Sequence, residues 1–293
     1  MRKISFLICI LLSSSSLYSQ YSEDYVETGI STINNERYGY IKMSRTGQRV
    51  KAKYFASKDN NNRTVYERYV EWARNKKIIA VSSGTYMTDW NIATAKPVGL
   101  CIDNGYPVNR SIESSKFDGL AIVYPSGGGG GIAVSNLKEG NVTVQDGSTP
   151  VTLNVRNQFD LNRFITWAER NTATVFQAHL FVYKNQILIK PDRASTNAAE
   201  RRFLAVGTNS DGDILHYIVN LSGSNSIYAA TEKVLRYLNK LEGINVTFMI
   251  NLDTGGQNAF KVYRSNGSED KSQDFVGTTP LQGAVNLLVY YFE

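Results

Sequence analysis

The sequence predicts a mixed α+β (α/β) fold: a single domain with a mixed, largely antiparallel sheet that is covered by two or three helices. Three segments show the apolar periodicity of amphipathic helices, whereas many short β-favouring stretches are separated by tight-turn signals. No internal repeat, long linker or block of charge divides the 293 residues. Many short strands with few helices favour antiparallel or mixed pairing over the parallel sheet of a doubly wound fold.

The chain begins with the pattern of a cleavable signal peptide over residues 1–20. Arg2 and Lys3 precede an apolar run at 4–12, and small polar residues follow it. This run is much shorter than the roughly 20 residues that cross a bilayer. We therefore expect a secreted or periplasmic protein without stable membrane insertion. Removal of Cys9 with the signal would leave Cys101 as the only cysteine and exclude an intramolecular disulfide.

Composition excludes several functional classes. The formal charge of +6 is scattered along the chain, which suits anionic ligands without indicating nucleic acid. His179 and His216 are the only histidines, and neither an HExxH nor a G-x-S-x-G motif is present, so a zinc or serine hydrolase is not expected. The glycine run Gly127–Gly131 lacks the Lys-Ser/Thr of a phosphate-binding loop. We interpret it as a surface loop, with a flap over a ligand as the alternative.

Residues 21–77 are expected to form N-terminal strands and a helix that pack on the core. Residues 38–43 are the clearest strand of this part. Asn62 or Thr64 is expected to cap the helix. Its apolar face carries Val65, Tyr69, Trp72 and Ala73.

Two more helices and a series of strands are expected after residue 77. One helix runs from about Asn157 to Asn171, and the other is capped by Ser226 and ends before Gly243. Asp103-Asn104-Gly105 is a strong turn signal. The inward residues of the first of these helices are expected to be Phe159, Phe164, Ile165 and Ala168. The expected strands are 78–81, 98–102, 120–124, 174–183, 186–189, 203–206, 214–219, 246–250, 259–263 and 285–292.

The polar segment Asn251–Gln257 directly follows the buried strand at 246–250. Asp253 supplies a carboxylate and Asn251 an amide, while Gly255 and Gly256 let backbone N–H groups approach a ligand closely. Anion and sugar sites are commonly built in this way. The alternative is a structural one, in which Asp253 closes an Asx turn at the end of the strand.

The same segment resembles the Asn-Leu-Asp-Gly-Gly-Gly-Ser signature of the phosphodiester glycosidase family. Further pieces follow in the order of that family, and the resemblance extends from about Ile78 to Tyr263. They are Ser83–Tyr86, Pro97–Gly99, Asp103–Gly105, Gln177–Leu180, Lys184-Asn185 and Arg202–Gly207. Residues 78–293 are therefore expected to form a phosphodiester glycosidase-like domain. Thr254 stands where the family usually has Gly, and Gln257 where it usually has Ser.

The resemblance implies hydrolysis of a sugar-1-phosphodiester, or of a phosphorylated glycan, that releases the sugar and leaves a phosphomonoester. An arginine is expected to bind the phosphate, with Arg202 as the first choice and Arg201 as the second. Because neighbours in a strand face opposite ways, only one of the two is expected to reach the site. Asp253 is expected to be the base for water or to stabilise positive charge at the anomeric carbon. His179 is expected to donate to a phosphate oxygen or to act as an acid, with a hydrogen-bonded core role as the alternative. Expected substrate-binding residues are Asn251, Gly255, Gly256, Gln257, Thr85, Asn104, Arg201 and Glu200; for Glu200 a surface ion pair with the neighbouring arginines is the alternative.

Two other functions fit the same residues. The chain is alternatively a binding module for phosphorylated glycans that has no catalytic activity, or a phosphodiesterase that cuts the P–O bond. In the latter case Asp253 would hold a divalent cation, and no other cofactor is expected.

Overall fold

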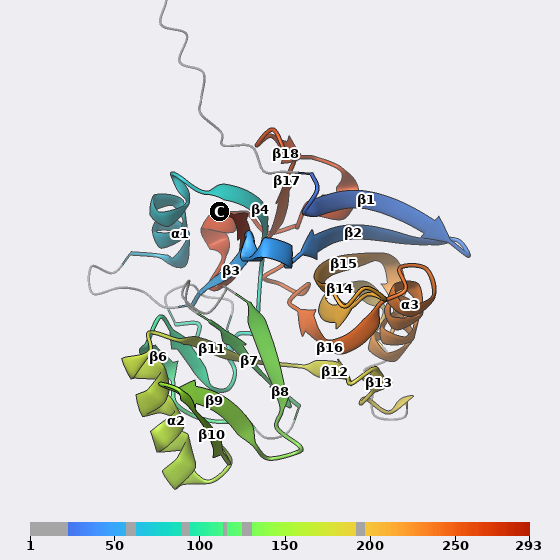
Figure 1. Cartoon of the computed structure of the whole chain (residues 1–293). Coiled ribbons are helices and arrows are strands. Elements are labelled where there is room, and N and C mark those ends of the chain that lie inside the picture. The colour runs from blue at the N-terminus through green and yellow to red at the C-terminus, as the bar shows by residue number, and fades with distance from the viewer. Residues whose placement is uncertain (1–22, 57–62, 90–93, 114–115, 125–130, 192–196) are drawn as a thin grey trace, which may run out of the picture.

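The computed structural model describes residues 23–56, 63–89, 94–113, 116–124, 131–191 and 197–293. The predicted signal peptide and the glycines 127–130 lie outside these residues. The described chain forms four sheets, in which every strand pair is antiparallel, and three α-helices (Figure 1). The predicted α+β class with antiparallel pairing is confirmed, but the strands are divided among several sheets.

The first sheet has seven strands and is covered on one face by α3 (Ile227–Lys240). The strand order is β1 (Val26–Ile33), β2 (Glu36–Ser44), β15 (Ile214–Asn225), β14 (Ala199–Thr208), β16 (Asn245–Leu252), β12 (Leu180–Tyr183) and β13 (Gln186–Ile187). Ser226 caps α3 as predicted, since its hydroxyl accepts a hydrogen bond from the Ala229 amide.

The second sheet has five strands and carries α1 (Val65–Ala73) on its outer face. The strand order is β18 (Glu269–Asp270), β17 (Phe260–Tyr263), β4 (Lys77–Ser82), β19 (Leu287–Phe292) and β3 (Val50–Phe55). Thr64 and Glu67 form a complete capping box at the start of α1, which confirms Thr64 as the cap. Short 3-10 helices occur at Thr46–Gln48, Gln273–Phe275 and Leu281–Gly283.

The third sheet also has five strands and is covered by α2 (Gln158–Arg170) together with a two-stranded sheet. Its order is β6 (Tyr106–Asn109), β5 (Cys101–Asp103), β11 (Thr174–Ala178), β7 (Gly119–Val123) and β8 (Ile132–Asn136). The small sheet pairs β9 (Val142–Asp146) with β10 (Thr149–Leu153). Asn104 and Gly105 both have positive φ in the two-residue turn between β5 and β6, as the turn signal predicts.

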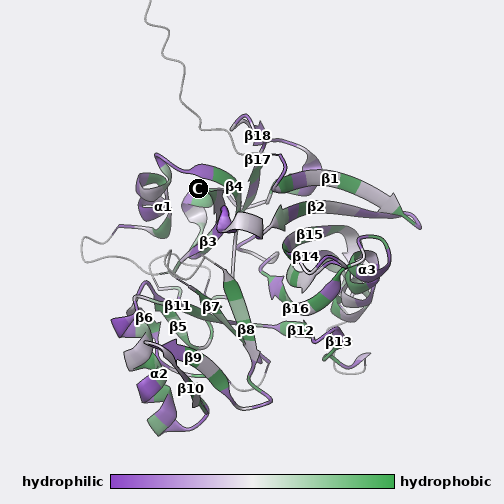
Figure 2. Ribbon diagram, viewed as in Figure 1, coloured by the Kyte–Doolittle hydropathy of each residue, from purple (hydrophilic) through white to green (hydrophobic). Residues whose placement is uncertain are grey.

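The three large sheets share one apolar core. Ile250 of the first sheet, Tyr290 of the second and Phe176 of the third belong to the same buried cluster. The ring of Tyr54 stacks on that of Phe176, with centroids 4.4 Å apart, and so joins the second sheet to the third. Figure 2 shows hydrophobic residues along β7 and β8 and hydrophilic ones on the outer turns of α2. The helices of the described chain are too short or too polar to span a lipid bilayer.

Two expectations about local structure are wrong. Residues 174–183 do not form one strand, because the chain leaves the third sheet after Ala178 and enters the first at Leu180. Phe159 does not face inward and is 71% exposed. The buried stripe of α2 follows Leu161, Phe164, Ile165 and Ala168, and Phe159 lies off this stripe by helical geometry.

The buried pair His216–Tyr290 predicts that stability depends on pH. His216 of β15 shares a hydrogen bond of 2.8 Å with the Tyr290 hydroxyl of β19. Burial, aided by Arg45, lowers the pKa of His216 to about 3, below the value of about 6.5 for an unfolded chain. Between these two pH values His216 binds a proton in the unfolded chain but not in the folded protein. The free energy of unfolding therefore falls by up to ~1.4 kcal/mol for each pH unit that the pH is lowered. Urea unfolding at pH 7 and pH 5 should show a smaller loss for His216→Gln than for the wild type. Equal losses would contradict this assignment.

Candidate active site

Several segments far apart in the sequence meet at the C-terminal end of β16. The amide of Asp253, just after β16, donates to the carbonyl of Gly84 over 3.1 Å. The amide of Asn251 donates to the carbonyl of His179, also over 3.1 Å, and its side chain donates to the Tyr86 hydroxyl. Arg202 of β14 is paired with Leu252. The turn after β4, the ends of β14 and β16, and the passage between β11 and β12 are therefore neighbours.

Arg202 is a fully buried cation in this cluster. Its Nη2 donates to the side chain of Asn258 over 2.9 Å and lies 3.5 Å from the Glu200 carboxylate. The guanidinium carbon lies 3.8 Å from the ring centroid of Phe260, a cation–π contact. Its Nε and Nη1 are buried and make no hydrogen bond with any described residue.

Burial lowers the pKa of Arg202 to about 10, although Glu200 and Asp253 oppose this shift. The guanidinium therefore remains charged at neutral pH. Unused N–H groups on two nitrogens of a desolvated cation are well suited to binding an anion, because water does not compete there. This is the strongest chemical feature of the cluster.

Asp253 is a buried carboxylate next to this cation. Its Oδ1 accepts a hydrogen bond of 2.8 Å from the Gly255 amide, so the Asx turn expected as the structural alternative does form. Burial raises the pKa of Asp253, while the Gly255 hydrogen bond and the charge of Arg202 oppose the rise. The structural contact and a chemical role do not exclude each other, because a turn that fixes the carboxylate also orients it.

Asn251, Tyr86 and His179 form the other side of the cluster. The Oδ1 of Asn251 is buried and has no hydrogen-bond partner among the described residues. The ring of His179 lies 5.1 Å from that of Tyr86 and 4.3 Å from that of Phe117, measured between centroids. Burial, with a smaller contribution from Lys116, lowers the pKa of His179 to about 4 despite the opposing charge of Asp118. His179 is thus neutral at pH 7, and its buried Nε2 has no hydrogen-bond partner among the described residues.

Other predicted site residues serve the framework of the turns. The Thr85 hydroxyl donates to the carbonyl of Gln177, and the Gln257 carbonyl accepts from Ser83. Gly255 and Gly256 are exposed. The Thr254 hydroxyl donates to the carbonyl of Glu200 over 3.0 Å, which ties this loop to β14.

Two predicted residues lie apart from Arg202. Arg201 lies on the opposite face of β14 from Arg202 and donates to the carbonyl of Asn197 over 2.6 Å, and its charge acts on Tyr86. Asn104 lies in the turn between β5 and β6 and lines a different pocket, together with Lys53 and Trp72. The charge of Asp253 acts both on Arg202, which lies with Glu200 on one face of β14, and on Tyr86, which lies with Asn251 and Arg201 on the other face, whereas Asn104 belongs to neither group.

Several residues of the cluster were not predicted. Asn258 and Tyr86 border the predicted segments, and their proximity in sequence is a usable signal. Asn286 has no such signal. It is buried, and its Oδ1 accepts hydrogen bonds from the amides of Gly84 and Thr85 at 2.8 and 3.1 Å, while its Nδ2 donates to the carbonyl of Thr85. A side chain at Gly84 would collide with Asn286 and with the ring of Tyr54.

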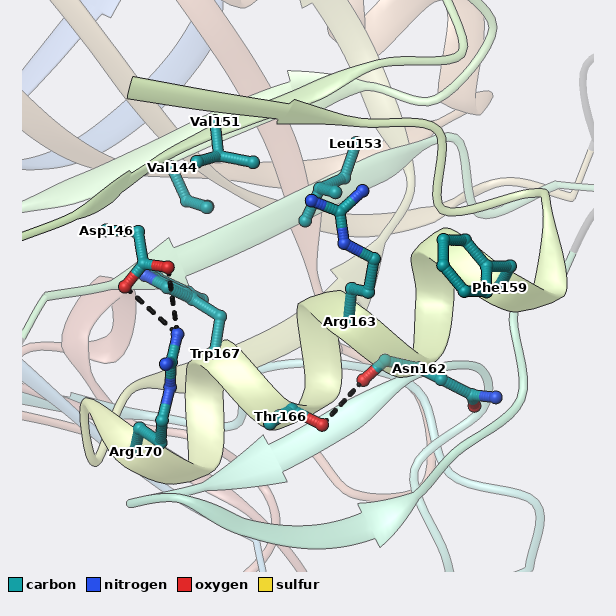
Figure 3. Close-up of a pocket in the computed structure, with 10 residues that line it drawn as sticks. All are labelled: Val144, Asp146, Val151, Leu153, Phe159, Asn162, Arg163, Thr166, Trp167 and Arg170. Atoms are coloured by element: carbon teal, nitrogen blue, oxygen red, sulfur yellow. Dashed lines mark hydrogen bonds and ion pairs between the residues drawn. The ribbon is translucent and has the colours of Figure 1, made fainter. Parts of the chain in front are cut away.

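Three pockets on the described surface are lined by other residues than Asp253 and Arg202. Figure 3 shows one of them, of about 400 Å³, between α2 and the strands β9 and β10. There the exposed ring of Phe159 and the ion pair of Asp146 with Arg170 lie at opposite ends. No group of three or more His, Cys, Asp or Glu side chains is arranged to hold a metal ion within the described residues. The candidate site thus rests on its buried polar groups.

The fold has a counterpart among solved structures. No family model matches the chain, and no curated protein matches its sequence. The catalytic domain of zebrafish N-acetylglucosamine-1-phosphodiester alpha-N-acetylglucosaminidase, auto-inhibited by its pro-peptide, is similar with a TM-score of 0.50 and 14% identity, covering 92% of this chain and 82% of that one. At this identity the likeness shows a shared fold.

Two further structures have lower scores. A hypothetical protein from Synechocystis has a TM-score of 0.44 and 9% identity, covering 92% of this chain and 62% of that one. A candidate exported protein from Burkholderia pseudomallei K96243 has a TM-score of 0.46 and 11% identity, covering 88% and 74%.

The contacts of Asn286 predict a large effect of its removal on stability. Asn286→Ala leaves two buried N–H groups and one carbonyl without partners, so we expect a loss of about 2–4 kcal/mol in the free energy of unfolding. Urea unfolding measures this loss. Asn162→Ala, an exposed change on α2, serves as the control, with an expected effect below about 0.5 kcal/mol. Similar small effects of both changes would show that Asn286 does not hold the turn.

Proposed function

We propose that this protein is an exported hydrolase that cleaves the sugar from a sugar-1-phosphodiester and leaves a phosphomonoester. The observation that carries the proposal is the fully buried guanidinium of Arg202, with two unused donors, beside the buried carboxylate of Asp253. The shared fold with a phosphodiester glycosidase domain supports the reaction class. The signal-like N-terminus of the sequence supports export.

The phosphodiester is the natural occupant for Arg202. Its two non-bridging oxygens carry the negative charge that the unused N–H groups of Arg202 would bind. Asn258 and the ring of Phe260 hold the guanidinium in place from the other sides. Because these groups are positioned before the substrate arrives, the charge that develops on the departing phosphomonoester meets a fixed cation in a site with little water.

Asp253 is the group proposed to activate water. The water oxygen forms a bond to the anomeric carbon while the bond from that carbon to the phosphate oxygen breaks. The phosphomonoester leaves with the electron pair, and Asp253 takes the proton of the water. A phosphomonoester is a good leaving group, so the reaction needs a base more than it needs an acid. Asn251 contributes its unused Oδ1 as an acceptor for a substrate hydroxyl.

Removal of the Asp253 carboxylate tests the reaction. We expect Asp253→Asn to reduce kcat by about 10²–10⁴-fold, the range for loss of a general base, while substrate binding remains. The assay follows release of phosphomonoester from a panel of sugar-1-phosphodiesters. The exposed change Asp211→Asn is the matched control and should retain full activity.

Hydrolysis in ¹⁸O-labelled water distinguishes the alternative functions. Label in the released sugar is expected. Label in the phosphate would show that the P–O bond is cut and would overturn the glycosidase proposal. Binding of every panel member without turnover in the wild type would instead identify a binding module.

The electrostatic coupling of Arg202 and Asp253 predicts a titration shift. The charge of Arg202 lowers the pKa of Asp253 against the effect of burial, so Arg202→Met should raise that pKa further. On acidification the carboxylate would then become protonated at a higher pH than in the wild type. The acid limb of the kcat/KM profile would move to higher pH as well. A ¹³C NMR titration of the Asp253 carboxyl measures the shift without relying on activity. Arg163→Gln on α2 should leave the titration unchanged, and an unchanged titration in Arg202→Met would contradict the coupling.

A further inference from the structure

The largest of the three described pockets lies between α1 and the outer face of the second sheet. Its volume is about 690 Å³, within the range of sites that bind small organic ligands. Residues 66–78 line one side, and β17 with the 3-10 helix Leu281–Gly283 lines the other. Figure 1 shows α1 beside this sheet. None of the residues of the candidate active site contributes to this pocket.

Three tyrosines form much of the pocket wall. The rings of Tyr66 and Tyr69 lie 6.4 Å apart, and Tyr69 shares a hydrogen bond with Tyr263. Ile78 and Leu281 supply apolar surface between them. Aromatic rings of this kind offer a flat apolar face with a polar hydroxyl at the edge. A ring-shaped ligand with polar substituents fits such a wall.

The charged groups that line the pocket are all cationic. They are Arg74, Lys76 and Lys261, and no described lining residue carries a carboxylate. Lys261 forms an ion pair with Glu269 at 2.7 Å, and Lys76 forms one with Glu293 at 3.1 Å. Neither glutamate lines the pocket. The exposed side chain of Arg74 makes no ion pair or hydrogen bond with any described residue. A net positive charge therefore remains, and Arg74 is the side chain most available to an anion.

Amide groups complete the polar lining. Gln282 donates to the Tyr66 hydroxyl over 3.3 Å, and Asn75 lies exposed at the rim. Together with the tyrosine hydroxyls they offer both donors and acceptors, which a hydroxylated ring uses and a plain aromatic ring does not. The lining thus matches an anion attached to a hydroxylated ring.

We propose that this pocket is a second binding site, specific for a phosphorylated sugar, with the phosphate at Arg74 and the sugar ring against the tyrosines. Phe260, which packs on Arg202, and Lys261, which lines the pocket, are consecutive residues of β17 and face opposite sides of the sheet. The sheet therefore separates the two sites. This second site does not depend on the proposed hydrolase activity.

Calorimetric titration of the full chain with glucose 1-phosphate tests the proposal. The Arg202→Met variant is used as the background, so that binding at the candidate active site is weakened and the pocket is observed. We expect binding to persist there. Adding Arg74→Gln or Tyr66→Leu should weaken it about tenfold or more, as the loss of a charge-assisted hydrogen bond or of an aromatic contact does.

Controls assign any binding to the pocket. Arg163→Gln, an exposed arginine on α2, should leave the affinity unchanged. Glucose alone and inorganic phosphate alone should each bind more weakly than glucose 1-phosphate. Equal affinity for inorganic phosphate would show a nonspecific anion site, and equal affinity for phenyl phosphate would overturn the preference for a sugar.

Two results would overturn the second site while leaving the hydrolase proposal intact. One is loss of all binding in Arg202→Met alone. The other is an affinity that is insensitive to both Arg74→Gln and Tyr66→Leu. Failure of Asp253→Asn to affect turnover would conversely contradict the hydrolase proposal and leave this pocket unaffected.

Discussion

The shared apolar core of the three large sheets is the constraint on which the rest of the structure depends. Each sheet buries one face against this core and has its other face covered by a different helix. Strands from separate sheets must therefore end close together around its rim. The turn after β4, the start of β14 and the end of β16 meet there for this reason. The candidate site therefore lies where strand ends of different sheets meet at the edge of the shared core.

The position of Arg202 at this rim is energetically unfavourable on its own. Taking a guanidinium out of water costs several kcal/mol, and an incompletely bonded one recovers only part of that cost. The negative charges of Glu200 and Asp253, the side-chain oxygen of Asn258 and the ring of Phe260 offset part of this desolvation cost. An apolar residue would fill the same space without the penalty. Residues that violate the ordinary rules of burial tend to mark function, which makes the free donors of Arg202 the most informative feature of the molecule.

Local signals in the sequence predict local structure well and the arrangement of sheets poorly. The caps Thr64 and Ser226 and the turn at Asn104 depend on a few neighbouring residues, so their patterns are sufficient. The division of strands among sheets depends on partners far away, and the change of sheet at His179 leaves no mark in an apolar stretch. The site follows the same rule. Motifs are sufficient to propose Asp253 and Arg202, whereas Asn286 acts on a turn some 200 positions earlier, with no local pattern to identify it.

Cys101 shows what close packing of the core means for reactivity. It is fully buried in the shared core, and burial, aided by the charge of Asp103, raises the pKa of its thiol well above the ordinary value. A thiol that is neither exposed nor ionised reacts slowly with oxidants and alkylating agents. Modification of Cys101 therefore requires the core to open. The rate at which a thiol reagent modifies Cys101 therefore measures how often the core opens.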